Sequence, residues 1–274
     1  MKKLFTLLCA LLLVFTMAGC SSSSSSSDTE EETASDLLEE IKARGYITIA
    51  SEGDWSPYTY HDETTGELTG FDVELGQLIA EKLGVEFEAQ ETDWDSILAG
   101  VQSGRYDLAI NGVTYTDERA ESYNFSDAYL YDQTVLIVLE DNDTITSFED
   151  LAGKITTNSP GSSYADMAIE YGAEVTYITT FADTIQMLKR GDAEATINAL
   201  AVYNDYLRAM GDDAGIKIVD STDPEKTVIA AQKSDATVTL IEEVNKILEE
   251  LREDGTLAEL SNKYFGYDAT VLPE

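Results

Sequence analysis

The fold of this chain is indicated first by residues 70–84, GFDVELGQLIAEKLG. Phe71 and Val73 alternate with acidic residues, which predicts a short extended start after Gly70. Apolar residues then recur at helical spacing, at Leu75, Leu78, Ile79 and Leu83. Such a stripe buries one side of a helix on a sheet, and acidic residues near a helix N-terminus suit its dipole. The segment therefore predicts an amphipathic helix of an α/β domain.

Strand-like and helix-like runs alternate on both sides of this helix. Around it, strands are predicted at 46–50, 85–89 and 106–111, and a helix at 94–103. A second series begins with a strand at 135–139 and includes helices at 147–151, 164–171, 181–190 and 200–210, with strands at 155, 175–178 and 195–198 between them. A strand at 227–232 and a periodic helix at 238–252 follow. This order predicts an α/β fold of two lobes, each a mostly parallel sheet flanked by helices, with a cleft between them.

The first residues have the features of a secretory leader. Lys2 and Lys3 precede an apolar run at 4–15, and small residues lead to Cys20. Cys20 resembles the lipid-modified cysteine of bacterial lipoproteins, although Met17 stands where leucine is usual; the alternative is a free cysteine in an uncleaved leader. Seven serines follow, so we expect a disordered tether at 20–36. The predicted location is extracytoplasmic, anchored to the outer face of a Gram-positive cell membrane or within a periplasm.

Composition excludes several classes of protein. The only cysteines are Cys9 and Cys20, both at the front, so a disulfide framework or a cysteine metal site in the main domain is excluded. A net charge of −36 argues against nucleic acid as a partner. The carboxylates indicate a solvated surface, or else attraction for cationic solutes or adaptation to salt. We expect no cofactor and no metal ion.

Residues 70–84 also resemble, position by position, the signature of the family 3 extracellular solute-binding proteins, the polar amino-acid receptors of ABC importers. Residues 254–266, DGTLAELSNKYFG, resemble the end of the same proteins. The resemblance implies a type II periplasmic-binding-protein fold whose chain crosses twice between lobes. After the leader (1–19) and the tether (20–36), it divides the chain into a first lobe (37–131 and 227–274) and a second lobe (132–226). It also implies a monomer that delivers its ligand to a membrane permease.

The sharpest chemical pattern lies at residues 111–119, NGVTYTDER. Glycine lets a ligand approach the backbone, threonine offers a hydroxyl, and the planar guanidinium of arginine suits a carboxylate. The segment is similar to the family's carboxylate-binding loop, which assigns ligand-binding roles to Asn111, Gly112, Thr114 and Arg119. The alternative is a surface arginine paired with Asp117 or Glu118.

Two further segments of the first lobe supply aromatic candidates. The family places an acidic residue and an aromatic after its first strand, which correspond here to Glu52 and Trp55, and a second aromatic at Trp94. The two tryptophans would flank the apolar part of a bound amino acid; alternatively they pack in the core. His61, the only histidine, lies in a turn-like segment and is expected to be solvated.

In the second lobe, residues 159–167, SPGSSYADM, read as a Gly-Ser turn that opens a helix. By resemblance, Gly161, Ser162 and Ser163 clamp the ligand's carboxylate, although an ordinary helix cap explains the same pattern. The family's aspartate for the ligand's ammonium aligns with Ala199, which cannot pair with a cation. Either Glu52 or Asn198 replaces it, or the ligand is not a plain α-amino acid.

The predicted function is a membrane-anchored receptor that captures a small polar amino acid for an ABC importer. Residues 94–114 are most similar to the branch that binds cystine and related amino acids. One alternative is a ligand-sensing subunit of a membrane signalling protein. A second is a dehydratase-type enzyme on the same fold, but the sequence presents no Ser/His/Asp set and no metal-ligand spacing.

Overall fold

The computed structural model describes residues 36–272. The predicted leader, Cys20 and the tether up to residue 35 lie outside the described residues. Within them, no helix combines the length and the apolar character that crossing a membrane requires.

The sheet of the first lobe has five strands in the order β5-β1-β6-β15-β7. These strands are β1 (Tyr46–Ser51), β5 (Glu86–Glu91), β6 (Leu108–Ala109), β7 (Tyr123–Phe125) and β15 (Ala230–Gln232). Strands β5 and β6 run parallel to β1, whereas β15 runs antiparallel to both β6 and β7. A strand from the end of the chain thus completes a sheet that the beginning of the chain starts.

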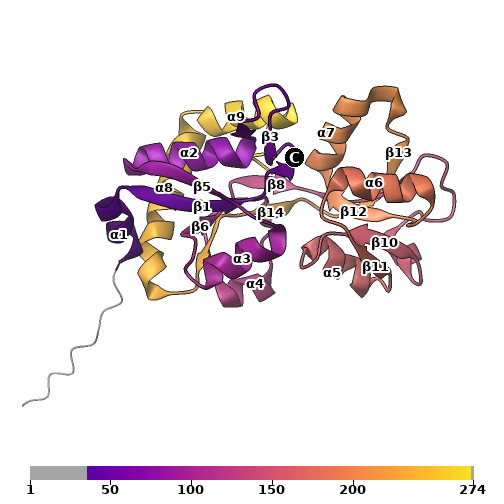
Figure 1. Cartoon of the computed structure of the whole chain (residues 1–274), viewed down its shortest axis with the longest axis horizontal. Helices are drawn as coiled ribbons and strands as arrows, with labels where there is room; N and C mark the ends of the chain where they lie inside the picture. The colour runs from indigo at the N-terminus through magenta and orange to yellow at the C-terminus, as the bar shows by residue number, and fades with distance from the viewer. Residues whose placement is uncertain (1–35, 273–274) are drawn as a thin grey trace, which may run out of the picture. The chain divides into compact units, whose positions relative to one another are not determined.

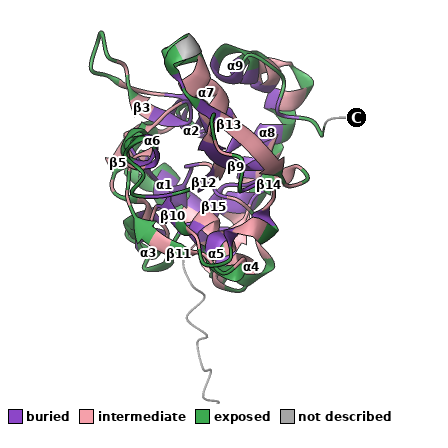
Figure 2. Ribbon diagram, turned by 90° about the vertical axis from the view of Figure 1, so that its right-hand side faces the viewer, coloured by how far each residue is buried: buried purple, intermediate pink, exposed green. Residues whose placement is uncertain are grey.

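Helices cover both faces of this sheet (Figure 1). One face packs against α1 (Leu37–Arg44), α2 (Phe71–Leu83), α8 (Val238–Glu253) and α9 (Thr256–Phe265), and the other against α3 (Trp94–Gln102). Because successive side chains of a strand point to opposite faces, Ile49 joins the core under α2 while Ala50 joins the core under α3. Both residues are buried, and Figure 2 shows buried residues gathered in the interior with exposed residues on the outer helices and loops.

The segment that indicated the fold is helical from its first apolar residue. We expected an extended start at Phe71, and that expectation is wrong. Gly70 has a φ of +125°, and the N–H groups of Phe71 and Asp72 donate to the carbonyls of Pro57 and Tyr58. The preceding loop thereby supplies acceptors for N–H groups in the first turn of α2, which have no partner within the helix. Phe71, Val73 and Leu75 are all buried because the helix is covered on several sides, so their alternation does not report a strand.

Other predicted boundaries change for local reasons. The strand expected at 106–111 shortens to β6, because the Asp107 carboxylate accepts hydrogen bonds from the Thr48 N–H and hydroxyl and pairs with Arg44. The strand expected at 227–232 is two strands, β14 (Glu225–Thr227) and β15. A small antiparallel sheet of β2 (Asp54–Trp55), β3 (Thr59–His61) and β4 (Leu68–Thr69) was not predicted.

The second lobe is built on a three-stranded sheet in the order β12-β9-β13. Strands β12 (Thr196–Ala199) and β13 (Ile216–Ser221) both run antiparallel to β9 (Thr134–Leu139), and β13 was not predicted. A parallel pair, β10 (Ile155–Asn158) and β11 (Glu174–Tyr177), adjoins β12 through a bridge between Thr156 and Ala195. The helix-flanked α/β class is confirmed, but the three-stranded sheet is antiparallel, so the strands of this lobe, like those of the first, are mixed rather than mostly parallel. Apolar strand runs indicate burial and do not indicate the direction of the neighbouring strand.

Helices α5 (Ser163–Glu170), α6 (Phe181–Arg190) and α7 (Leu200–Met210) flank these strands. The helix expected at 147–151 is a short 3-10 turn, η1 (Phe148–Leu151), and similar turns occur at η2 (Gly211–Asp213) and η3 (Asp235–Thr237). Within β9, Leu136 and Val138 face one core cluster and Val135 and Ile137 the other.

Two strands join the lobes. The chain leaves the first sheet through β8 (Leu130–Asp132), which leads directly into β9, and returns through β14 after β13. Strands β8 and β14 pair antiparallel, and Figure 1 shows them between the two lobes. The lobes are therefore linked by a narrow two-stranded connection, which is the kind of connection that permits hinge motion.

Candidate ligand-binding site

One cavity lies between the lobes and encloses about 590 Å³, including the space at its mouth. From the first lobe, its walls come from the segments that follow β1 and β6, from the start of α3, and from α4 (Asp117–Ser122). From the second lobe they come from the ends of β10 and β12 and from the starts of α5 and α6. The site therefore lies at the carboxyl ends of strands, where open α/β sheets bind ligands.

The structure brings ten of the eleven predicted binding residues to this one cavity. They are Glu52, Trp55, Trp94, Asn111, Gly112, Thr114, Arg119, Ser162, Ser163 and Asn198. Gly161 does not line it; instead, its carbonyl accepts a 3.0 Å hydrogen bond from the Trp94 indole N–H. Because this bond joins α3 of the first lobe to the α5 turn of the second, the described conformation has the lobes closed on each other at that point.

Arg119 is held with its guanidinium facing the cavity. The Thr116 hydroxyl caps α4 by accepting from the Arg119 backbone N–H at 3.1 Å, and the guanidinium donates to the Thr114 carbonyl at 3.0 Å. The guanidinium also lies 5.5 Å from the centre of the Trp94 ring, as a cation–π contact. Burial lowers its pKa from the ordinary value. Among residues 36–272 it forms no ion pair, so the alternative pairing with Asp117 or Glu118 is not found.

Glu52 forms a reciprocal pair with Asn111 on the first-lobe wall. The Asn111 side-chain amide donates to the Glu52 carboxylate at 2.8 Å, and its oxygen accepts from the Glu52 backbone N–H, also at 2.8 Å. Burial raises the pKa of the Glu52 carboxyl to about 7; the charges of Asp54 and Asp93 raise it as well, whereas Asn111 lowers it. The carboxyl is thus poised to ionise when a cation approaches it.

Gly112 allows the backbone to pass close beneath Trp55. Its φ is +56°, and a Cβ atom there would lie 2.4 Å from the Trp55 ring. Its N–H donates to the buried Asp72 carboxylate at 2.6 Å. Trp55 in turn stacks on Tyr58 with ring centres 4.4 Å apart. A larger residue at 112 would displace this aromatic wall.

On the second lobe, the two serines of the α5 turn differ. The Ser162 hydroxyl accepts from the Ala165 N–H and donates to the Ser159 carbonyl, so it is an N-cap, as the alternative interpretation proposed. The Ser163 hydroxyl, which also lines the cavity, makes no hydrogen bond within the described part of the chain. Ser163 therefore has a free hydroxyl for a ligand, whereas Ser162 can contribute little beyond holding the turn.

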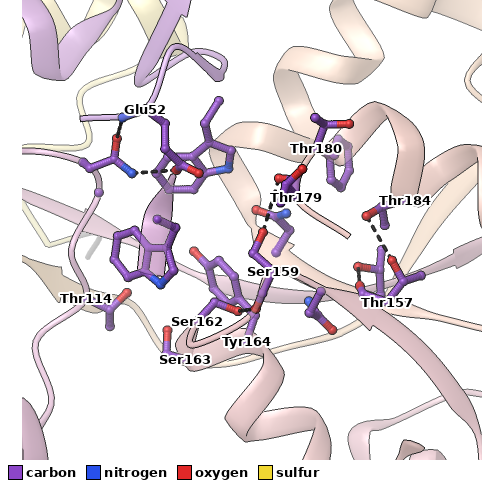
Figure 3. A pocket seen from close by; sticks show the side chains of 18 of the residues that line it. Glu52, Thr114, Thr157, Ser159, Ser162, Ser163, Tyr164, Thr179, Thr180 and Thr184 are labelled. Carbon is purple, nitrogen blue, oxygen red and sulfur yellow. Dashed lines mark hydrogen bonds between the residues drawn. The ribbon is translucent and has the colours of Figure 1, made fainter. Parts of the chain in front are cut away.

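Sequence reasoning missed much of the second-lobe wall. The additional lining residues are Thr157, Asn158, Ser159, Tyr164, Thr179, Thr180, Phe181, Thr184 and Thr196, several of which appear in Figure 3. They follow or end predicted strands, so the rule that ligands bind at carboxyl strand ends could have identified them. Ala199, which aligns with the family's aspartate, is buried as the N-cap of α7 and does not line the cavity. The cavity therefore has no carboxylate from this part of the chain.

The remaining titratable candidates lie away from the cavity. His61 is exposed and contacts the Glu91 carboxylate at 2.7 Å, in agreement with its expected solvation. The Gly66 carbonyl and then Glu91 raise its pKa. In the described part of the chain, no group of three or more His, Cys, Asp or Glu side chains is arranged to hold a metal ion.

The chain matches the bacterial extracellular solute-binding proteins, family 3, over residues 47–267. The L-cystine-binding protein TcyA of Bacillus subtilis is 36% identical over 272 residues, which cover 98% of this chain and 100% of TcyA. A probable amino-acid ABC transporter-binding protein of Haemophilus influenzae is 36% identical over 86% of this chain and 91% of its own length. An ancestral arginine-binding protein, solved with arginine and with glutamine, is 36% identical with a TM-score of 0.74, covering 81% of this chain and 99% of its own.

Proposed function

Because this chain belongs to the bacterial extracellular solute-binding proteins of family 3, we propose that it captures a small polar amino acid, cystine or a related one, and delivers it to the permease of an ABC importer. The functions of its relatives support amino acids as the ligand class and an importer as the partner. The fold supplies two lobes, a cavity between them and a narrow connection that can act as a hinge.

One observation carries the proposal. The Arg119 guanidinium lies against the cavity, partly desolvated, without a carboxylate partner among the described residues. An unpaired, partly buried cation is unfavourable unless an anion joins it, and a guanidinium suits a carboxylate in two parallel hydrogen bonds. We assign the ligand's α-carboxylate to Arg119, with the Thr114 and Ser163 hydroxyls as additional donors.

The α-ammonium is assigned to Glu52, the only carboxylate among the lining residues described. Glu52 thus pairs with the ammonium, which the methyl side chain of Ala199 cannot do. Binding a cation favours the ionised carboxylate, so the pKa of about 7 in the empty site falls when the ligand binds. Trp55 and Trp94 then flank the ligand from the first lobe.

We also propose that the lobes divide between residues 131 and 132 and between 226 and 227, positions that lie within β8 and β14. Cys20 is proposed as the lipid anchor and residues 20–36 as its tether to the outer face of the membrane. Replacement of Cys20 by serine should release the protein from the membrane fraction, which immunoblotting of fractionated cells would measure.

Ligand titration by thermal shift tests the receptor function. The panel contains the L-amino acids, cystine, polyamines and simple carboxylates. A ligand present at about 100 times its dissociation constant adds about 2.7 kcal/mol to the free energy of unfolding, which gives a clear rise in Tm. A rise with an α-amino acid or cystine supports the proposal. A rise only with carboxylates that lack an amine would contradict the assignment to Glu52, and no rise with any compound would contradict an amino-acid receptor.

A further inference from the structure

The cavity has no charge left over after the proposed binding of the amino-acid head group. Its lining contains one carboxylate, Glu52, and one guanidinium, Arg119, and the other described lining residues are neutral. This argument rests on the proposed function, in which those two groups hold the α-ammonium and the α-carboxylate. A charged ligand side chain would then meet a neutral wall, and burying a charge without a partner is costly.

The neutral wall contains an unsatisfied hydrogen-bond acceptor. Asn158, at the end of β10, is 4% exposed, and its side-chain N–H donates to the Ile197 carbonyl at 2.7 Å. A carbonyl only accepts, so this bond fixes which end of the amide is nitrogen. The Asn158 Oδ1 atom is buried and has no hydrogen-bond partner. Buried acceptors in folded proteins are nearly always paired, so this atom calls for a donor from outside the chain.

A free donor lies on the neighbouring strand. Asn198, on β12, accepts a hydrogen bond from the Ala199 N–H at 2.8 Å through its side-chain oxygen. That bond likewise fixes the orientation of the amide, and the Asn198 Nδ2 group makes no hydrogen bond within residues 36–272. The Asn158–Ile197 bond ties β10 to β12 directly beside Asn198. Both asparagines line the cavity.

The threonines of the same wall are mostly engaged with each other. The hydroxyls of Thr157 and Thr184 lie 3.0 Å apart, and the Thr196 hydroxyl donates to the Thr157 carbonyl at 2.6 Å. Figure 3 shows Thr157 and Thr184 facing one another. The two asparagines therefore stand out as a neutral pair with one acceptor and one donor unused.

We propose that Asn158 and Asn198 select amino acids whose side chain carries no net charge and ends in a group that both donates and accepts hydrogen bonds. The end group donates to Asn158 Oδ1 and accepts from Asn198 Nδ2. A primary amide meets this requirement, and so does the second head group of cystine, through its ammonium and its carboxylate. Arginine, lysine and glutamate do not meet it, because each places an uncompensated charge against the neutral wall.

Isothermal titration calorimetry of the purified protein with L-glutamine, L-cystine, L-arginine and L-glutamate is the first test. We expect glutamine or cystine to bind at least about tenfold more tightly than arginine and glutamate. Tighter binding of glutamine would identify an amide as the preferred end group, and tighter binding of cystine would identify a second head group. Preferred binding of arginine or glutamate would overturn this inference and leave the receptor function standing. No binding by any of the four overturns this inference, and the thermal-shift panel then decides whether the receptor function stands.

The second test places a charge on the wall. Asn198→Asp keeps the side chain's shape, and one oxygen still accepts from the Ala199 N–H while the unused Nδ2 group becomes a carboxylate oxygen. The ratio of arginine affinity to glutamine or cystine affinity should therefore rise at least about tenfold. Asn262→Asp is the control, because Asn262 is exposed on α9 and lies outside the cavity lining. It should leave the ratio unchanged.

An unchanged ratio in a folded Asn198→Asp variant would overturn the selecting role of Asn198. If that variant fails to fold, which a thermal melt would reveal, Asn198→Ala removes the unused donor instead, and an unchanged affinity for glutamine or cystine would overturn the same role. The ligand preference of the unmodified protein is measured independently of either variant.

Discussion

The two walls of the cavity differ in chemistry. The first lobe contributes both charged groups, Glu52 and Arg119, and the two tryptophans, whereas the second contributes hydroxyls, two asparagine amides and the start of α5. A charged head group gains most from oppositely charged partners, and a neutral side chain gains most from hydrogen bonds of matched direction. Under the proposed binding mode, we expect the first lobe to supply most of the affinity and the second lobe most of the selectivity.

The two ends of the interface between the lobes are joined by different hydrogen bonds. On the cavity side, the Trp94 indole donates to the Gly161 carbonyl across the mouth. Near the connection, the Asp132 carboxylate accepts from the Tyr58 hydroxyl at 2.5 Å and from the Ala201 N–H at 3.4 Å, which links the first lobe to the start of α7. Hydrogen bonds therefore join the lobes at both ends of the interface.

Arg119→Ala gives the largest expected effect on the charged wall. Removing the guanidinium leaves the ligand's carboxylate with neutral donors only, and breaking a buried charge pair costs about 3–5 kcal/mol. The affinity for any amino-acid ligand should fall at least about 100-fold, since about 1.4 kcal/mol corresponds to tenfold. Calorimetric titration measures it.

Arg105→Ala is the matched control, because Arg105 is exposed and lies over the Tyr106 ring, 5.3 Å from its centre, much as Arg119 lies over Trp94. It should bind ligand as the unmodified protein does. Wild-type affinity in Arg119→Ala would place the carboxylate elsewhere and would remove the distinction between the walls.

Glu52→Gln should have the next largest effect and should exceed that of Asn198→Ala. Glutamine can keep the hydrogen bond with Asn111, but it removes the one negative charge among the described lining residues. A hydrogen bond to a charged group contributes about 1.5–3 kcal/mol, whereas a neutral one contributes about 1 kcal/mol. We expect roughly a 10- to 100-fold loss for Glu52→Gln and about fivefold for Asn198→Ala. Equal losses in titrations of the two variants would show that the ammonium is not held by the first lobe.

The pH dependence of stability without ligand should reveal the buried carboxyls. Burial raises the pKa of Glu52 and Asp72 to about 7 and that of Asp132 to about 6. The folded state therefore holds protons that the unfolded state has already lost, so stability falls as the pH rises from about 4 to about 7. A melt at pH 7.5 should show a lower Tm than one at pH 5.

Repulsion among the many surface carboxylates acts in the same direction, so the informative quantity is the difference between proteins. Glu52→Gln should flatten the pH profile, and since one pKa unit corresponds to about 1.4 kcal/mol, the Tm change between the two pH values should shrink by at least about 3 °C. Identical profiles for the variant and the unmodified protein would show that Glu52 is ionised in the empty site.

Trp94→Phe should produce the smallest change. Phenylalanine keeps a ring beside Arg119 but loses the N–H that reaches the Gly161 carbonyl, one neutral hydrogen bond contributing about 1 kcal/mol to the closed form. Ligand affinity should fall about three- to sixfold, mainly through faster dissociation, which stopped-flow fluorescence of the remaining tryptophan would follow. A loss as large as that of Arg119→Ala would mean that Trp94 contributes to the charged wall rather than to closure.

The sequence by itself determined the α/β class, most helices and the first-lobe candidates. The helices at 181–190 and 200–210 were placed at their observed bounds, because apolar periodicity follows burial on one side of a helix. The prediction also placed Gly112, Arg119 and Ser163 among the binding residues, and all three line one cavity. In turns that follow strands, the residue type itself indicates a binding role, without reference to distant parts of the chain.

Only the tertiary structure decided the rest. Strand direction around β9, the return of β15 to the first sheet and the small β2–β4 sheet depend on partners distant in sequence. The tertiary structure also decides which polar groups have no hydrogen-bond partner within the described residues. The Ser162 hydroxyl is engaged as a helix cap, whereas Asn158 keeps a free acceptor because its amide nitrogen donates to a carbonyl of another strand. A residue's type states which hydrogen bonds it can make, but packing decides which of them are left for a ligand.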